Sequence, residues 1–358
     1  MKDVRILAIN PGSTSTKIAV YQNTEPLFLK NIKHSSEELN RYPKITDQFE
    51  FRKEIILQQL NDANFHLNQF DAVIGRGGLL KPIPSGVYEV NEAMIADLRN
   101  SPIREHASSL GGLIAYNLIK SLNGVKAYIA DPVVVDELND IARISGHPLF
   151  ERISIFHALN QKAIAREFAR SVNRKYDELN LIVVHMGGGI SVGAHAKGRV
   201  IDVNQALSGE GPFSPERSGT LPVDQLAKLC FSGDYTLKQV QRIITGEGGL
   251  VAYFGTNNAC EVEKMVEEGD PKATLIYHAM AYQIAKCIGE MYTVLKCEVD
   301  AIIITGGVAY DKGFVKWIQE RIFKMAPIHV YPGEDEMRAL AINGLMVIRG
   351  EYEVKEYK

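Results

Sequence analysis

The sequence has few cysteines, and their spacing excludes the commonest cysteine-based sites. No two of them form a C-x-x-C motif, and no cluster of cysteine and histidine has the spacing of a zinc site. This pattern predicts reduced thiols in a cytoplasmic protein. The four positions are Cys230, Cys260, Cys287 and Cys297.

Long apolar runs and an excess of charge of one sign are also absent. No stretch of 18 apolar residues occurs, so no transmembrane helix is expected, and the first residues lack the pattern of a signal peptide. The net charge of −3 and the pI of about 6.3 favour neither nucleic acid nor an anionic membrane as a partner.

Two common nucleotide-binding motifs are missing as well. The chain contains neither the Walker pattern G-x-x-x-x-G-K-[ST] nor the Rossmann pattern G-x-G-x-x-G. What stands at residues 6–21 instead is ILAINPGSTSTKIAVY, an apolar run, a turn of small polar residues and a second apolar run.

This first turn is a candidate phosphate clamp. If its second strand begins near Ser15, then Ser15 and Lys17 point to one face of the strand, because side chains alternate with a period of two. A hydroxyl and an ammonium group, together with turn N–H groups and the nearby Asn10 and Ser13, form a suitable anion site. The alternative is a polar hairpin turn with a solvated lysine.

The 358 residues suggest two domains, and alternating strand-like and helix-like runs predict an α/β fold. Strands are expected at 4–9, 18–21, 72–74, 127–130, 181–185, 190–194, 301–305 and 328–331. Helices are expected from about 91, and at 107–122, 136–144, 158–172 and 270–295. The last is the clearest: Asp270 suits its N-cap, Pro271 its first turn, and Cys287 lies in its buried stripe.

Two further glycine-rich turns follow strands. The segment HMGGGIS, with His185 and Gly187, Gly188 and Gly189, lies between two strands and echoes the first turn, so we expect two similar halves. Gly306 and Gly307 follow the strand at 301–305, where α/β proteins present backbone to nucleotides. A tight hairpin and an ordinary loop are the alternatives.

Charged residues in loops supply the remaining candidates. Arg76 in GRGG and Arg217 in GEGPFSPERSGT can present a planar fork to a carboxylate or phosphate, although a loop arginine is more often solvated. Asp131 ends a strand and suits magnesium or a turn. His157 lies where a strand meets a helix. Glu336, in PGEDEMRALA, suits either a metal or a solvated helix start.

These motifs occur in one order along the whole chain, and that order resembles the acetate and butyrate kinase family. The order is N-x-G-S-T-S-x-K, G-R-G-G, A-D-P, F-H-A, H-M-G-G-G-I-S, P-E-R-S-G, T-G-G-V and P-G-E-D-E. The stretches NPGSTSTK, SGVYEVNE, DPVVVDEL and FHALNQKA are similar to butyrate kinase in particular. The resemblance implies two ribonuclease H-like (actin-like ATPase) α/β domains facing each other across a nucleotide cleft.

The resemblance also implies a role for each candidate. Arg76, Arg217 and His157 would be catalytic, and Asp131 would be both catalytic and a magnesium ligand. Glu336 would be linked to magnesium, with Glu334 as the alternative register. ATP or ADP would be bound by Asn10, Ser13, Ser15, Lys17, His185, Gly187, Gly188, Gly189, Gly306 and Gly307. The acid would be bound by His106, Phe156, Gly209 and Gly211.

The implied domains are residues 1–150 with about 338–358, and residues 151–337, the second one binding nucleotide and contacting a partner in a homodimer or larger homo-oligomer. The implied reaction is reversible in-line transfer from ATP, with Mg²⁺, to a short-chain carboxylic acid.

The chain departs from acetate kinases next to both arginines. Arg76 leads directly into Gly77 and Gly78, and Ser208–Phe213 lacks the bulkier Pro/Leu pattern of acetate kinases. We therefore expect butyrate or a branched short acid as the substrate. The alternatives are acetate or propionate, a sugar or polyol kinase, and an ATP-driven binding protein without enzymatic activity.

Overall fold

The computed structural model describes residues 3–100 and 106–358. The chain folds into two compact units: unit 1 comprises the chain up to Val135 together with Asp335–Lys358, and unit 2 comprises Asp136–Glu334. The sequence analysis placed the corresponding boundaries at 150 and 337. In the described ranges, no helix combines the length and the hydropathy needed to span a membrane.

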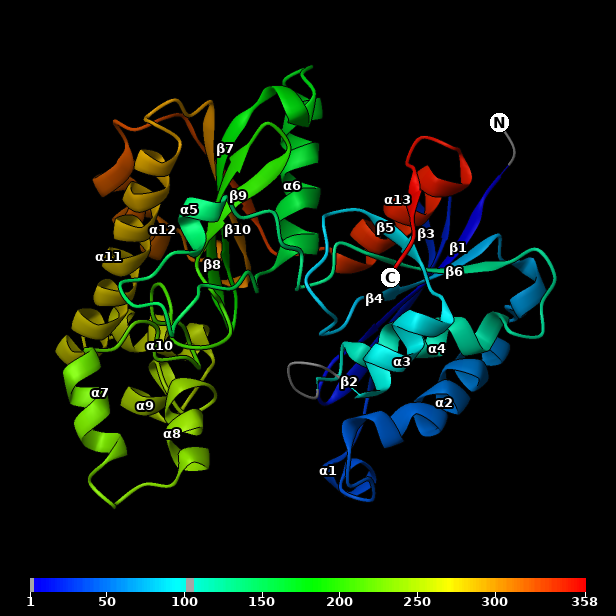
Figure 1. The fold of residues 1–358 in the computed structure, drawn as a ribbon, viewed down its shortest axis with the longest axis horizontal. Helices are drawn as coiled ribbons and strands as arrows, with labels where there is room; N and C mark the ends of the chain where they lie inside the picture. The colour runs from blue at the N-terminus through cyan, green and yellow to red at the C-terminus, as the bar shows by residue number, and fades with distance from the viewer. Residues whose placement is uncertain (1–2, 101–105) are drawn as a thin grey trace. The chain divides into compact units, whose positions relative to one another are not determined.

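Unit 1 is built on a seven-stranded sheet in the order β12-β5-β6-β4-β1-β2-β3 (Figure 1). β1, β2 and β3 are successive antiparallel neighbours, whereas β1, β4 and β6 run parallel. Its strands are β1 (Arg5–Pro11), β2 (Ser15–Gln22), β3 (Glu25–Lys33), β4 (Ala72–Arg76), β5 (Val87–Glu89), β6 (Lys126–Ala130) and β12 (Val354–Lys355). Its helices are α1 (Ser36–Leu39), α2 (Phe49–Asp62), α3 (Glu92–Asn100), α4 (Ser109–Ile119) and α13 (Glu336–Ile348), with 3₁₀ turns η1 (Ile45–Gln48) and η2 (Leu67–Gln69).

The central strands β1 and β4 of the unit 1 sheet are apolar at most positions, and their side chains are buried on both faces. Leu7 and Val73 pack into a core with side chains from α2, α3 and α4. Alternate residues Ile6 and Ile74 face Gly344 of α13 on the other side. The C-terminal helix therefore completes the unit that the N-terminal strands begin.

Unit 2 is built on a five-stranded sheet in the order β11-β10-β7-β8-β9. Its strands are β7 (Asn180–Met186), β8 (Ile190–Ala196), β9 (Arg199–Val203), β10 (Ala301–Gly306) and β11 (Ile328–Pro332). Its helices are α5 (Asp140–Arg143), α6 (Ala158–Ser171), α7 (Val223–Cys230), α8 (Leu237–Ile244), α9 (Leu250–Phe254), α10 (Ala259–Glu267), α11 (Pro271–Val294) and α12 (Lys312–Ile322), with 3₁₀ turns η3 (Tyr176–Glu178) and η4 (Gly307–Tyr310).

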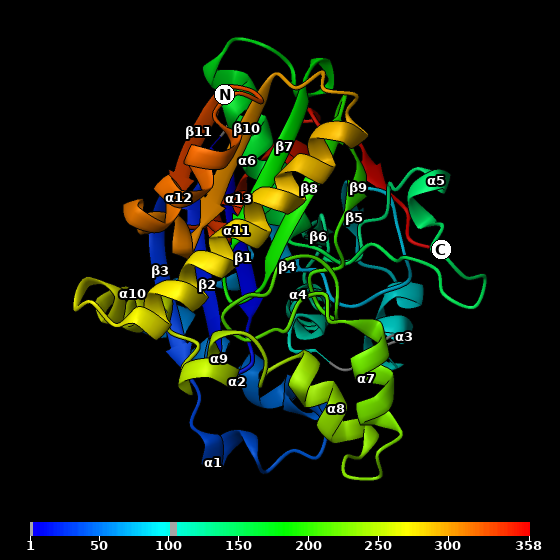
Figure 2. The same cartoon turned by 90° about the vertical axis from the view of Figure 1, so that its left-hand side faces the viewer.

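Two layers of helices sandwich this sheet. Ile182 and Val184 pack with α11, and the alternate residues Leu181 and Val183 pack with α6. In Figure 2, α11 lies in front of β7 and β8, with α6 behind them. The order β10-β7-β8-β9 repeats the order β4-β1-β2-β3 of unit 1, with the same parallel and antiparallel pairs. The expected duplication of a strand-turn-strand unit is thereby confirmed.

The clearest helix prediction is confirmed, and one helix prediction is wrong. Asp270 caps α11 by accepting hydrogen bonds from the N–H groups of residues 272 and 273, and Cys287 is buried in its stripe. The expected helix at 136–144 is reduced to the four residues of α5. The reason is that the Asp136 carboxylate binds both Nη atoms of Arg143 at 2.7 Å and the N–H of Leu138 at 3.2 Å, which fixes a loop instead.

Candidate active site

The first candidate turn lies between β1 and β2, in unit 1. Strand β2 begins at Ser15, as expected, and Lys17 is the direct cross-strand partner of Asn10. These side chains consequently share one face of the hairpin. The turn is closed by a hydrogen bond of 2.7 Å from Gly12 N to Ser15 O. Ser13, at the tip, is exposed.

The backbone of this turn is hydrogen-bonded to a buried arginine that the sequence analysis missed. Arg52 of α2 is 0% exposed and donates to the carbonyl oxygens of Gly12, Ser13 and Ser15 at 2.8–3.2 Å. It also donates to Thr16 Oγ1 and to Gln48 Oε1. Burial lowers its pKa to about 10, so the guanidinium stays charged at neutral pH. The turn is therefore pre-organised around a fixed cation.

Arg76, Asn10 and Glu336 meet at the end of β4. Arg76 binds the Glu336 carboxylate through two nitrogens, at 3.0 and 3.2 Å, and Asn10 Nδ2 donates to Glu336 Oε2 at 2.5 Å. The Arg76 and Glu336 side chains are 22% and 12% exposed. Glu336 is the first residue of α13, as the helix-start interpretation expected, but its carboxylate binds Arg76 and Asn10 instead of being solvated. The helix cap is the neighbouring Asp335, which accepts from the N–H of residue 338.

The glycines around Arg76 allow α4 and the loop after β6 to approach it. A Cβ on Gly111 would overlap the backbone of Arg76, one on Gly77 would lie 2.5 Å from Pro132 Cβ, and one on Gly78 would overlap Ser109. His106 lies just before α4, where its Nδ1 contacts Ser108 Oγ at 2.7 Å. The glycines of GRGG thus allow α4 and the loop after β6 to pack closely around Arg76 at the end of β4.

Asp131 occupies a left-handed turn at the end of β6, with φ of +36°. It is 2% exposed, and its Oδ1 accepts hydrogen bonds from Ser85 Oγ at 2.6 Å and Gly86 N at 2.9 Å. In the part of the chain that the structure describes, no group of three or more His, Cys, Asp or Glu side chains could hold a metal ion.

Unit 2 brings together two predicted histidines. The rings of His157 and His185 stack with centroids 4.0 Å apart and planes at 23°. His157, at the start of α6, contacts Ser191 Oγ through Nδ1 at 2.9 Å. His185, on β7, contacts Asn160 Oδ1 through Nδ1 at 2.8 Å and Glu334 Oε2 through Nε2 at 3.4 Å. Glu334 and Glu336, the two alternatives for the magnesium-linked acid, therefore make different contacts: Glu334 lies next to His185, and Glu336 binds Arg76.

The glycine turn after β7 receives the guanidinium of Arg217. A Cβ on Gly189 would overlap Arg217 Nη1 and lie 2.6 Å from its Cζ, so only glycine fits there. Arg217 Nη1 donates to the carbonyl of Ala206, and Nη2 lies 3.7 Å from Glu216. Gly187 N donates to Gly189 O at 3.0 Å, which closes the turn. The predicted second phosphate turn and Arg217 consequently form one cluster.

The third predicted turn is bonded to the end of β11. Gly306 has φ of +96°, and a Cβ there would overlap the backbone of Met186. Its N–H and C=O both bond to Gly333, at 3.0 and 2.9 Å. Nothing lies within 4 Å of a Cβ on Gly307, whose surface is open.

The predicted acid-pocket residues of unit 2 are Phe156, Gly209 and Gly211. Phe156 is 2% exposed. Gly209 and Gly211 have φ of +79° and +73°, and a Cβ on Gly211 would lie 2.5 Å from Asn204 Nδ2. Backbone conformation and close packing therefore explain these glycines, and they provide no evidence of an open acyl pocket.

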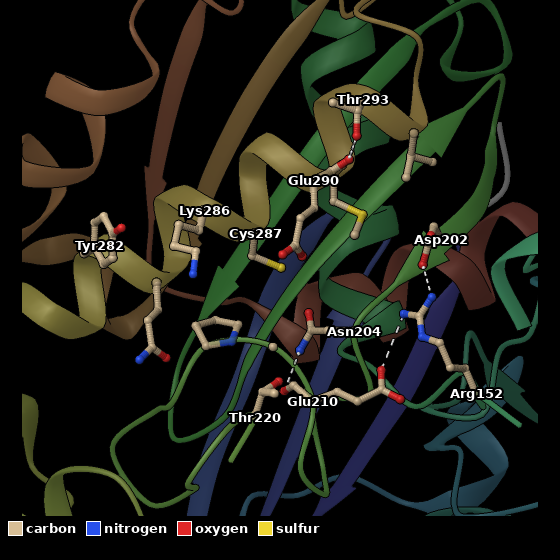
Figure 3. Close-up of a pocket in the computed structure, with 15 residues that line it drawn as sticks. Arg152, Asp202, Asn204, Glu210, Thr220, Tyr282, Lys286, Cys287, Glu290 and Thr293 are labelled. Atoms are coloured by element: carbon tan, nitrogen blue, oxygen red, sulfur yellow. Dashed lines mark hydrogen bonds and ion pairs between the residues drawn. The ribbon is translucent and has the colours of Figure 1, made fainter. Parts of the chain in front are cut away.

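Gly211 instead borders a cavity of about 710 Å³ between α11 and the loop after β9 (Figure 3). Arg152, on its wall, pairs with Asp202 at 3.0 Å and with Glu210 at 3.4 Å. On the opposite wall, Lys286 and Glu290 come from α11. The charged lining differs from what an aliphatic chain requires.

Comparisons with known proteins agree with this architecture. The sequence profile of the acetokinase family matches residues 151–341, more than half of the chain. The fold is similar to that of acetate kinase from Porphyromonas gingivalis, with a TM-score of 0.76 at 18% identity, covering 97% of this chain and all of the other. A propionate kinase from Francisella tularensis gives 0.74 at 17% identity, covering 95% and 98%. A putative N-acetylmannosamine kinase from Listeria monocytogenes gives 0.53 at 14% identity, covering 97% and 100%. The fold is that of the actin-like ATPases.

Proposed function

The chain belongs to the acetokinase family, and we propose that it transfers the γ-phosphoryl group of ATP to butyrate or a branched short acid, forming an acyl phosphate and ADP. The transfer is direct, in line and reversible. Family membership supports the coarser activity, which is that of a kinase for short-chain carboxylates. Acetate and propionate are the alternative acceptors within this activity.

The state of Asp131, the general base weighed from the sequence, favours a carboxylate acceptor. A sugar hydroxyl must lose a proton during transfer, and kinases use an aspartate for this. The candidate weighed from the sequence, Asp131, is buried and accepts hydrogen bonds from Ser85 and Gly86. A carboxylic acid with a pKa of about 4 is already ionised at pH 7 and needs no base. This buried, bonded state of Asp131 is the observation that carries the proposal.

What a carboxylate does need is relief from repulsion by the γ-phosphate. Arg217, which packs on the Gly189 turn, is suited to the equatorial phosphoryl oxygens. His157, on the same unit, is suited to contact the same group and stacks on His185, which precedes that turn. Arg76 presents a fork that can bind the acid bidentately, and in this structure Glu336 holds that fork. Lys17 and Asn10 are suited to the nucleotide phosphates. Such preorganised donors act mainly by electrostatic stabilisation and positioning.

The residues present fit a magnesium ion that is bound mostly through phosphates, since Mg²⁺ commonly takes only one or two carboxylates from the protein. Glu336 and Asp131 would be those carboxylates, and the ion would supply charge neutralisation at the β- and γ-phosphates. Mg²⁺ is typical of the family, whose members use ATP and ADP.

The preference for four carbons rests on the similarity of NPGSTSTK, SGVYEVNE, DPVVVDEL and FHALNQKA to butyrate kinase, because packing and backbone conformation explain the glycines near Arg76 and Arg217. Each methylene buried in an apolar pocket contributes about 0.8 kcal/mol. Two extra methylenes would thus favour butyrate over acetate by about 1.6 kcal/mol, or roughly 15-fold in kcat/KM.

One assay tests the activity and the substrate together. The protein is mixed with ATP, Mg²⁺, hydroxylamine and one acid of a series from acetate to valerate, including isobutyrate, and the acyl hydroxamate is measured. We expect kcat/KM to peak at four carbons. A peak at acetate would overturn the butyrate preference but leave the carboxylate kinase activity intact. ATP hydrolysis without hydroxamate for any acid would refute the carboxylate kinase itself.

A further inference from the structure

A buried chain of polar side chains runs from His157 into unit 2. His157 Nδ1 contacts Ser191 Oγ at 2.9 Å, and Gln161 Nε2 contacts the same Oγ at 2.8 Å. Gln161 Oε1 then lies 2.9 Å from His195 Nε2, and His195 Nδ1 lies 2.7 Å from Tyr176 Oη. Ser191, Gln161 and His195 are each 0% exposed.

One backbone carbonyl fixes the direction of every hydrogen bond in this chain. Gln161 Nε2 also lies 3.1 Å from the carbonyl oxygen of Ser191, which can only accept, so the amide NH₂ must face it. Gln161 Oε1 is therefore the atom that faces His195, and His195 Nε2 must carry a proton. His195 Nδ1 is then an acceptor for the Tyr176 hydroxyl.

The same logic determines the state of His157. The Ser191 hydroxyl accepts from Gln161, and its own proton has one available acceptor among the described residues, namely His157 Nδ1. Since Nδ1 accepts, the proton of the neutral His157 ring is carried by Nε2.

The surroundings keep His195 neutral, as this scheme requires. Burial, followed by the charges of Lys162 and Arg166, holds the pKa of His195 well below its ordinary value of 6.5. Among the described residues, the Tyr176 phenol also faces the ring and is hydrogen-bonded to His195 Nδ1.

This chain of polar side chains lies between one face of β8 and one face of α6, with a glycine at position 193. Ser191, Gly193 and His195 share one face of β8, and His157 and Gln161, four residues apart, share one face of α6. A Cβ on Gly193 would lie 2.6 Å from Gln161 Oε1 and 3.2 Å from His195 Nε2. Burying several polar groups contributes little net stability compared with an apolar core. This favours a positioning role over a purely structural one.

We infer that Ser191, Gln161, His195 and Tyr176 are positioning residues that hold His157 in its Nε2–H tautomer and in one ring orientation. Resting on the proposed function, this presents a neutral N–H donor to the transferring phosphoryl group. His157 Nε2–H can therefore donate a hydrogen bond without prior protonation of the ring. The hydrogen bonds to the residues of α6 and β8 fix the direction in which this N–H points.

The tautomer is tested directly by ¹⁵N NMR of the full-length protein labelled in histidine, with the His157 signals assigned from the spectrum of His157→Asn. We expect an unprotonated Nδ1 and a protonated Nε2 at neutral pH, with exchange between tautomers appearing in Ser191→Ala. A protonated Nδ1 in the wild-type protein would overturn the inference. This measurement is independent of turnover, so failure of the proposed kinase activity would be seen separately.

Kinetics test the consequence. Ser191→Ala should lower kcat about 10- to 100-fold with little change in either KM, by analogy with residues that orient metal-ligating histidines. Ser191→Thr, which restores a hydroxyl, should recover most of the loss. Ser171→Ala is the matched control, because Ser171 lies on the same helix α6 and its hydroxyl donates to the carbonyl of Phe168 at 2.7 Å, outside the chain of polar side chains. Wild-type kcat in Ser191→Ala would refute the positioning role.

Discussion

The contact between Gly189 and Arg217 provides the sharpest prediction. A Cβ at position 189 would overlap Arg217 Nη1 and lie 2.6 Å from Cζ, whereas carbon atoms normally approach to about 3.5–4.0 Å. In Gly189→Ala the guanidinium must therefore move by roughly 1 Å or more. A misplacement of about 1 Å can cost about 100-fold in rate, and losing one preorganised donor costs about 100- to 1,000-fold, or about 2.7–4 kcal/mol.

We therefore expect Gly189→Ala to lower kcat in the hydroxamate assay by about 100-fold or more while the melting temperature changes little. Gly188→Ala is the matched control in the same turn, because its Cβ would meet Glu216 Oε1 at an ordinary 3.4 Å. Arg217→Ala should lose a similar factor, and adding Gly189→Ala to it should cost little more, since both changes remove one interaction. If the kcat of Gly189→Ala were within about threefold of the wild-type value, the position of the Arg217 guanidinium against this turn would not matter for turnover.

Three further predictions concern the turns and the core. Lys17→Ala should raise the KM for ATP and lower kcat, with an unfolding free energy within about 0.5 kcal/mol of wild type in urea titrations; unchanged ATP kinetics would contradict the phosphate clamp. Arg52→Leu should cost about 3–5 kcal/mol of unfolding free energy, because it removes one partner from a buried charged network; a loss below about 1 kcal/mol would contradict this. Because the pKa of His195 is lowered in the folded state, the unfolded chain binds the extra proton as pH falls below about 6.5. Its contribution to stability is thus present above that pH and is lost below it, so urea midpoints between pH 7 and 5 should fall less in His195→Gln than in wild type.

Local signals in the sequence were sufficient to predict the parts of the fold that frame the candidate site. Both glycine turns follow apolar strands, and the period of two places Ser15 and Lys17 on one face of β2. The cap and apolar stripe of α11 are likewise encoded within its own residues. By contrast, β3 and the pair α7 and α8 were not expected, and all three are largely exposed. In α7 and α8 the apolar residues do recur at helical spacing, a signal that the sequence analysis did not use.

The contacts that position the site were not predictable, because they join residues far apart in the chain. Arg52 stands in FRKEIILQQL beside Lys53, and only its spacing to Ile56 and Leu60, at i+4 and i+8, marked it as part of a buried stripe. Gln161 and His195 are ordinary polar residues in sequence. Their role became visible only once β8 and α6 were packed together.

The segment PGEDE shows why charge density alone misleads. Three consecutive acids suggest a solvated helix start, yet each of them makes a different contact. Glu334 lies 3.4 Å from His185 in unit 2, Asp335 caps α13, and Glu336 binds Arg76 in unit 1. The chain passes between the units at this point, so neighbouring acids are separated into different structures. Repulsion within the segment is then offset by partners about 150 and 260 residues away in sequence, and the helix that begins here carries the carboxylate that fixes the fork of Arg76.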